Sequence, residues 1–140
     1  MIYGTKQTNA PVWNINDLKP GDKVFIARPS TIGWKSFRYN TYQEYTVEKI
    51  TPKKTKVYLT NDVLRANDMS PVEVQPNKTQ LYKESEQLAL ENRIANCAQT
   101  CSHLIYKIDS TKDKLSAMSD DEILELHGYL SSALELLEKQ

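Results

Sequence analysis

The chain of 140 residues carries no net charge, because its 18 Lys and Arg residues balance 18 Asp and Glu residues. Hydrophobic residues make up 39% and charged residues 26% of the sequence, values typical of globular domains that exclude wholesale disorder. No segment approaches the roughly 18 consecutive apolar residues of a membrane helix, and no secretory leader opens the sequence. We therefore expect a cytoplasmic protein that does not span a membrane.

The neutral total conceals two halves of opposite charge. Residues 1–79 hold 12 basic and 7 acidic side chains, a net charge of +5, whereas residues 80–140 hold 6 and 11, a net charge of −5. The first half is rich in aromatic residues and turn signals, and the second has helical periodicity. This division predicts two binding surfaces of different chemical character.

An N-terminal arm precedes the first strand signals. We expect residues 1–16 to form this arm, with Trp13 and Ile15 as its anchors. Pro20 and Gly21 then predict a tight turn, because proline presets the backbone and glycine tolerates a positive φ. A strand over residues 23–27 should follow, and we expect the next loop at residues 29–33.

A long strand and its antiparallel partner are predicted next. Residues 34–50 are rich in aromatic and β-branched side chains, which favour a strand with Tyr45 and Val47 on one face. Residues 51–55 are typical of a hairpin loop, and the alternation over residues 56–60 predicts the returning strand.

The barrel should close with short segments. Residues 72–74 and 79–82 are candidates for one or two further strands, whereas residues 61–71 show little periodicity and are expected to be an irregular connection. These signals together predict a small, antiparallel, SH3-like barrel over residues 17–82.

From about residue 83 the apolar period changes from that of a strand to that of a helix. Apolar residues recur at steps of four and three, which is an a/d seam. The seam consists of Leu90, Ile94, Cys97, Cys101, Leu104 and Ile108. Because both cysteines fall on it, we expect them to be small buried apolar residues.

A second helix begins at a well-specified position. Ser119 and Glu122 have the spacing of a capping box, and acidic residues in the first turn suit the positive end of a helix dipole. Its apolar stripe is broader than a seam and needs several neighbours. The stripe consists of Ile123, Leu124, Leu126, Leu130, Ala133, Leu134, Leu136 and Leu137.

The predicted fold class is α+β: an N-terminal antiparallel SH3-like barrel followed by two antiparallel helices. The domains would be an arm over 1–16, the barrel over 17–82 and a helical hairpin over 83–140. Because each part is small, the helices are expected to dock on the barrel, on a second copy as a homodimer, or on both. The candidate partner or oligomer surface on the second helix comprises Leu124, Leu134, Glu125, Glu135 and Glu138.

The barrel region has the composition of a nucleic-acid-binding surface. Between residues 19 and 60 there are nine basic and three acidic side chains, interleaved with aromatic residues. Cations neutralise phosphates and flat rings stack on bases, so the combination suits nucleic acid or a nucleotide. In the plainer alternative, half of the rings form the barrel core and the lysines protect edge strands from pairing.

Function is expected to concentrate at residues 33–39, a segment too short to bury its many apolar and cationic side chains. Trp34, Lys35, Arg38 and Tyr39 are the candidate binding residues there. A second cluster at a hairpin tip, formed by Lys53, Lys54 and Lys56, suits either phosphate contact or simple solvation.

No catalytic or cofactor-binding constellation is evident. Cys97, Cys101 and His103 are the nearest approach to a zinc site, yet no matching second pair of ligands accompanies the cysteines. The sequence has no phosphate-binding glycine loop, and no motif sets a nucleophile beside a base. We expect a protein that is not an enzyme and that uses no metal or cofactor.

Three segments resemble one family of small barrels. The runs LKPGDKV at 18–24, EYTVEKI at 44–50 and KVYL at 56–59 resemble the SH3-like or KOW-like barrels of small bacteriophage proteins. Many such proteins also follow the barrel with a charged helix and end in a short helix like the one starting with SDDEIL at 119–124. The resemblance implies this architecture, and a location in the host cytoplasm if the protein is phage-encoded.

The leading hypothesis is an accessory protein whose basic barrel binds nucleic acid or a nucleotide and whose helices mediate self-association. The alternative is an anti-defence inhibitor that binds a host protein through its acidic helices or exposed loops. A third possibility is an oligomer that encloses a small nucleotide between barrels.

Overall fold

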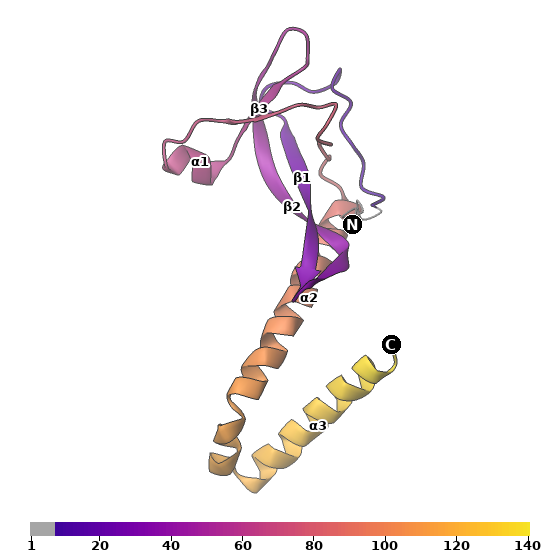
Figure 1. Ribbon diagram of the computed structural model, residues 1–140, viewed down its shortest axis with the longest axis vertical. Helices are drawn as coiled ribbons and strands as arrows, with labels where there is room; N and C mark the ends of the chain where they lie inside the picture. The colour runs from indigo at the N-terminus through magenta and orange to yellow at the C-terminus, as the bar shows by residue number, and fades with distance from the viewer. Residues whose placement is uncertain (1–7) are drawn as a thin grey trace. The chain divides into compact units, whose positions relative to one another are not determined.

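The computed structural model describes residues 8–140 and forms two compact units, the first ending at Ser102 and the second comprising His103–Gln140. The protein has the predicted α+β class, with a curled antiparallel sheet followed by helices (Figure 1). Residues 1–7 of the predicted arm lie outside the described residues.

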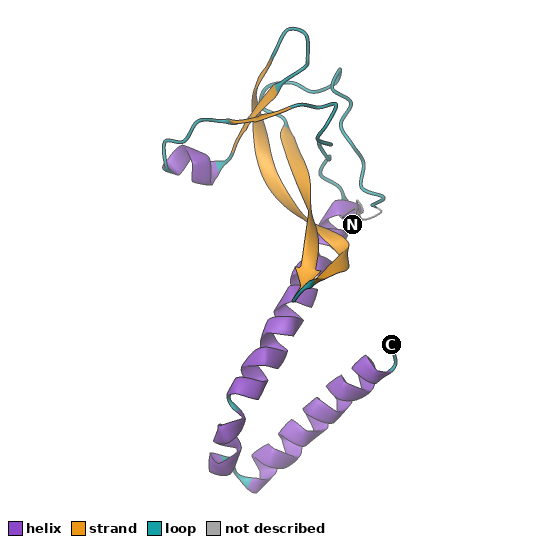
Figure 2. Ribbon diagram, in the orientation of Figure 1, coloured by secondary structure: helices purple, strands orange, loops and turns teal. Residues whose placement is uncertain are grey.

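The sheet contains four antiparallel strands in the order β1-β2-β3-β4. They are β1 (Lys23–Ile32), β2 (Lys35–Ile50), β3 (Val57–Thr60) and β4 (Val72–Val74). The register shifts between Pro29 and Thr31 in β1 and between Val47 and Lys49 in β2. Such irregularities bend and twist a strand, so the sheet curls into a half-barrel (Figure 2).

The turn that leads into β1 is built as predicted. The amide of Asp22 donates to the carbonyl of Lys19 at 3.1 Å, and Gly21 has φ +94°. With Pro20 at the second position and a positive φ at the third, this is the geometry of a type II turn.

Two extended segments continue the sheet beyond β1. Phe25 and Tyr82 exchange both of their backbone hydrogen bonds, at 3.0 and 2.8 Å, and the amide of Trp13 donates to Leu81 at 2.7 Å. Tyr82 also bridges to Val12. Of the strand expected at residues 79–82, only this bridged stretch forms, and it joins the N-terminal segment to the sheet.

The main core lies on one face of the curled sheet. Its buried members are Leu18, Val24, Tyr45, Val47, Val57, Leu59 and Leu81. Tyr45 and Val47 thus share a buried face as predicted, and the expected anchors Trp13 and Ile15 pack against the same cluster.

The helix α2 (Glu86–Ser110) packs with its N-terminal part against the opposite face of β1 and β2. Leu88 packs there in a second buried cluster with Ala10, Phe25, Tyr42 and Tyr82. The side chain of Ser85 caps the helix by accepting from the amide of Leu88 at 3.1 Å.

A buried carboxylate fastens α2 to the sheet. Glu91 is 1% exposed and accepts hydrogen bonds from the Thr8 hydroxyl at 2.8 Å, the Tyr42 hydroxyl at 3.1 Å and the Gln87 amide at 3.0 Å. The side-chain oxygen of Asn92 accepts from the amide of Tyr42 at 2.9 Å. The contact between helix and sheet is therefore largely polar.

The stripe of α2 that meets the sheet is not the predicted seam. The buried residues of α2 are Leu88, Glu91 and Ala95. At about 100° per residue, this stripe is centred roughly 140° around the helix from the seam that contains Leu90 and Ile94. The seam thus faces away from the sheet.

Three sequence-based expectations about local structure were wrong. Residues 29–33 are not a loop, because β1 continues to Ile32 and Gly33-Trp34 alone form the turn. The connection at 61–71 contains the short helix α1 (Asp62–Ala66), whose first turn is capped by the Asn61 side chain. Cys97 and Cys101 are exposed rather than buried, because the seam that carries them is not the face against the sheet.

In the second unit, the end of α2 is followed by a 3-10 turn, η1 (Lys112–Ala117), and by α3 (Asp120–Glu138). The predicted capping box is present: Ser119 accepts from the amide of Glu122, whose carboxylate accepts from the amide of Ser119. The hydrogen bond from the Ser119 amide favours the ionised carboxylate and lowers the pKa of Glu122. None of the residues of α3 is buried.

Candidate nucleic-acid-binding surface

The best candidate site is the tip of the β1–β2 hairpin. Ile32 pairs with Lys35, so the loop between the strands has only the two residues Gly33 and Trp34. Gly33 has φ +61°, a conformation that residues with a Cβ atom adopt at a cost. A loop this short has no further residues that could cover the Trp34 side chain.

Trp34 is fully exposed, with 103% of its reference surface accessible to solvent. Burying an aromatic side chain removes about 150–250 Å² from water. At about 25 cal/mol per Å² this burial is worth roughly 4–6 kcal/mol. The fold gains none of it at Trp34, which favours a role for this ring in contact with a partner.

Aromatic and cationic side chains lie together in β2 just after the turn. The guanidinium carbon of Arg38 lies 5.2 Å from the centroid of the Tyr39 ring, within cation–π range. The Phe37 and Tyr39 rings pack at an angle, with centroids 5.7 Å apart. The structure thus brings Trp34, Lys35, Arg38 and Tyr39 into one continuous turn-and-strand segment.

The cations at the tip lack the acidic partners that Lys23 has at the other end of the hairpin. Lys23 lies 3.3 Å from Glu44 and 3.7 Å from Glu84, and the hydrogen bond and charge of Glu44 raise the pKa of Lys23. Within residues 8–140, Lys35 and Arg38 make no ion pair with any carboxylate. Residues 28–43 contain three basic side chains and no acidic one. The tip therefore carries uncompensated positive charge.

The helix α2 holds the tip-proximal part of the hairpin in place. The Gln99 amide donates to the Ser30 hydroxyl at 3.0 Å, and Ser30 and Asn40 are both buried. Between residues 87 and 102 the single acidic side chain is Glu91, which is itself buried. The supporting helix consequently adds no exposed negative charge beside the tip.

The second predicted cluster lies at the other end of β2. Lys54 and Lys56 line a shallow pocket of about 300 Å³ with Thr55, Gln75 and Asn77, and Lys53 is exposed nearby in the loop. Lys56 is paired with Glu73 at 3.3 Å, and Lys54 donates to the Asn16 side chain at 3.3 Å. The strand β2 runs between this cluster and Trp34. Its 16 residues, at about 3.3 Å each, give a length of about 50 Å along the strand. The structure does not bring the two clusters together.

The predicted partner surface falls on α3. Leu124, Leu134, Glu125, Glu135 and Glu138 are all exposed there. Glu125 accepts a hydrogen bond from the Tyr129 hydroxyl at 2.9 Å. At about 100° per residue, Leu124 and Leu134 lie about 80° apart around the helix. The three glutamates, like Leu124, lie outside the arc from Leu136 to Leu134 that holds the other apolar residues of the stripe.

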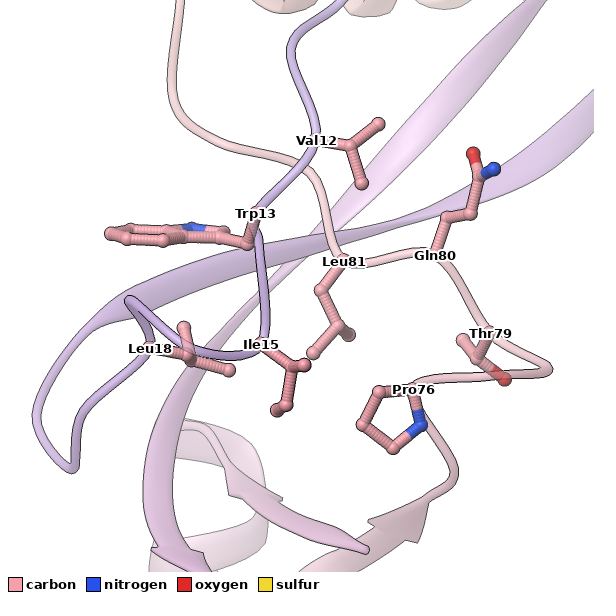
Figure 3. A pocket seen from close by; sticks show the side chains of 8 residues that line it. All are labelled: Val12, Trp13, Ile15, Leu18, Pro76, Thr79, Gln80 and Leu81. Carbon is pink, nitrogen blue, oxygen red and sulfur yellow. The ribbon is translucent and has the colours of Figure 1, made fainter. Parts of the chain in front are cut away.

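A pocket of about 220 Å³ near the N-terminal segment was not anticipated from the sequence. It is lined mainly by apolar side chains of the arm and of the segment before α2 (Figure 3). Its lining comprises Val12, Trp13, Ile15, Leu18, Pro76, Thr79, Gln80 and Leu81. Half of these residues also belong to the main core or pack against it, so the pocket is continuous with the packing that anchors the arm.

In the part of the chain that the structure describes, residues 8–140, no three His, Cys, Asp or Glu side chains are grouped so that they could hold a metal ion. No helix in it combines the length and the apolar character that a membrane crossing requires.

Comparison with protein-family models, with curated proteins and with solved structures gives no match for this chain.

Proposed function

We propose that the tip of the β1–β2 hairpin binds single-stranded nucleic acid, with Trp34 stacking on a base and Lys35 and Arg38 neutralising phosphates. The observation that carries the proposal is the fully exposed Trp34 ring in a segment, 28–43, that has three cations and no acid. A single strand fits better than a duplex because a stacking ring needs an unpaired base face.

The polar contacts that hold the hairpin also support this function. A stacking residue contributes more to affinity when its position is fixed before binding, because less conformational entropy is lost. The bond between Gln99 and Ser30 and the bond between Asn92 and the Tyr42 amide hold the strands below the tip. Trp34 is thus presented on a supported strand pair rather than on a long loop.

The proposal is tested by fluorescence anisotropy with a labelled oligothymidine at a low and a high salt concentration. The double variant Lys35→Ala, Arg38→Ala should bind more weakly and lose about 1.4 from the slope of log affinity against log salt, at about 0.7 per phosphate contact. Arg65→Ala is the matched control, since it removes an exposed cation from α1 and should leave the slope unchanged.

A second labelled ligand and one competitor show which kind of ligand is bound. A labelled duplex should bind more weakly than the single strand, and thymidine monophosphate should compete poorly. Affinity that does not change with salt would contradict a phosphate-contact mechanism. Full competition by the mononucleotide would replace the strand with a nucleotide as the ligand.

A further inference from the structure

The helix α3 presents an exposed apolar face along its length. Its apolar residues recur at steps of three and four, and Leu134 and Leu137 are 56% and 58% exposed. Leu130, at the centre of the stripe, is 40% exposed. A helix with this repeat is stable in water only when the stripe is covered, so α3 requires a partner.

The width of the stripe sets how many partner helices it needs. At about 100° per residue, the apolar arc from Leu136 through Ala133 and Leu130 to Leu134 covers roughly 160° of the helix surface. A single neighbouring helix covers only the narrower a/d seam. The arc of α3 therefore fits a bundle in which two helices flank it.

The helix α2 carries a second exposed apolar stripe. Its sheet-facing side is occupied by Leu88, Glu91 and Ala95, whereas Leu90 and Leu104 on the seam are 49% and 50% exposed. Each chain thus has two long helices with one open stripe each in its described part. Two chains supply the four helices that a bundle requires.

The charges beside the stripes favour one pairing. Along the seam, from Leu90 to Ile108, the exposed charged side chains of α2 are Arg93 and Lys107, because the one acidic residue there, Glu91, is buried. Residues 119–140 hold six acidic side chains and one basic side chain. Two α3 helices side by side would place like charges together, whereas α3 beside α2 places opposite charges together.

We propose that two copies of this chain associate through the stripes of α2 and α3 into a four-helix bundle, in which α3 of each copy lies beside α2 of the other. The contact would be isologous, because each copy contributes both stripes to a closed twofold arrangement. This inference is independent of nucleic-acid binding, since it involves neither the hairpin tip nor its cations.

Sedimentation equilibrium of the full chain tests the proposal. The chain has a mass of 16.1 kDa, so two copies have twice that mass, about 32 kDa. The double variant Leu130→Lys, Leu134→Lys should sediment as a monomer, because it places two charges in the buried part of the bundle. Ser132→Lys, on the polar side of the same helix, is the matched control and should stay dimeric.

Three results would overturn the proposal: a wild-type monomer up to sub-millimolar concentration, a wild-type species larger than a dimer, or a double variant that is folded and dimeric. If circular dichroism shows that the double variant does not fold, hydrogen exchange on the wild type decides. The amides of α3 should become more protected as protein concentration rises, and protection that is independent of concentration would contradict the bundle.

Discussion

Replacing Glu91 with alanine should destabilise the first unit by about 2–4 kcal/mol. The carboxylate accepts three hydrogen bonds, from Thr8, Tyr42 and Gln87. Hydrogen bonds to a charged group are worth about 1.5–3 kcal/mol each, and a buried donor left without a partner costs about 1–3 kcal/mol. Two effects reduce the loss: the Thr8 and Tyr42 hydroxyls, 2.9 Å apart, can still bond to each other, and a buried charge is removed.

Urea unfolding at neutral pH and one protein concentration measures this effect, with the fluorescence of the core-packed Trp13 reporting on the first unit. Glu91→Gln keeps the side-chain volume and one carbonyl acceptor, so its cost should be smaller. Asn96→Ala changes an exposed position of α2 and should stay within about 0.5 kcal/mol of the wild type. A Glu91→Ala variant as stable as Asn96→Ala would refute the claim that this carboxylate fastens the helix to the sheet.

Three smaller predictions concern backbone strain and pH. Gly33→Ala should cost roughly 1–2 kcal/mol in urea unfolding, because nothing lies near the added Cβ and only the positive φ is unfavourable; Gly33→Asn should cost less. Burial raises the pKa of Tyr42, so stability should fall as pH rises above about 10, where the unfolded chain ionises first, and Tyr42→Phe should fall less steeply. The hydrogen bond from the Ser119 amide lowers the pKa of Glu122, so the cap of α3 should be lost only as pH falls through that lowered value. Carboxyl NMR titration should show the pKa returning toward its ordinary value in Ser119→Pro, which lacks this amide.

Local signals allowed much of the fold to be predicted. The Pro20-Gly21 turn, the long second strand, the loop at residues 51–55 and the capping box at Ser119 each depend on neighbouring residues whose preferences agree with the final structure. The error at residues 29–33 has a local cause. A proline is uncommon inside a strand, but a register shift between Pro29 and Thr31 accommodates Pro29 within β1.

The docking face of α2 was not predictable from hydrophobic periodicity. The stripe that meets the sheet includes Glu91 and Gln99, which hydrogen-bond across the interface instead of packing as apolar side chains. Periodicity therefore identified the more apolar seam and implied that Cys97 and Cys101 are buried. The sequence does place Glu91 at helical spacing with Leu88 and Ala95, on one side of α2. This spacing indicates the docking face only once the partner of Glu91 in β2, Tyr42, is known.

The residues of the candidate site could be predicted from the sequence, but the positions of the two basic clusters relative to each other could not. Composition placed Trp34, Lys35 and Arg38 in a segment too short to bury them, and the structure places them at an exposed tip. Composition could not show that Lys54 and Lys56 lie at the far end of β2, because the distance between the clusters depends on how far the hairpin continues.

The most direct test of the central claim is the tryptophan fluorescence of the protein titrated with an unlabelled oligothymidine at low salt. Trp34 is fully exposed and Trp13 packs against the core, so base stacking should quench emission from Trp34. We expect saturable quenching in the wild type and its loss in Trp34→Phe, where Trp13 alone emits. Unchanged wild-type emission, or equal quenching in the variant, would contradict nucleic-acid binding at the hairpin tip.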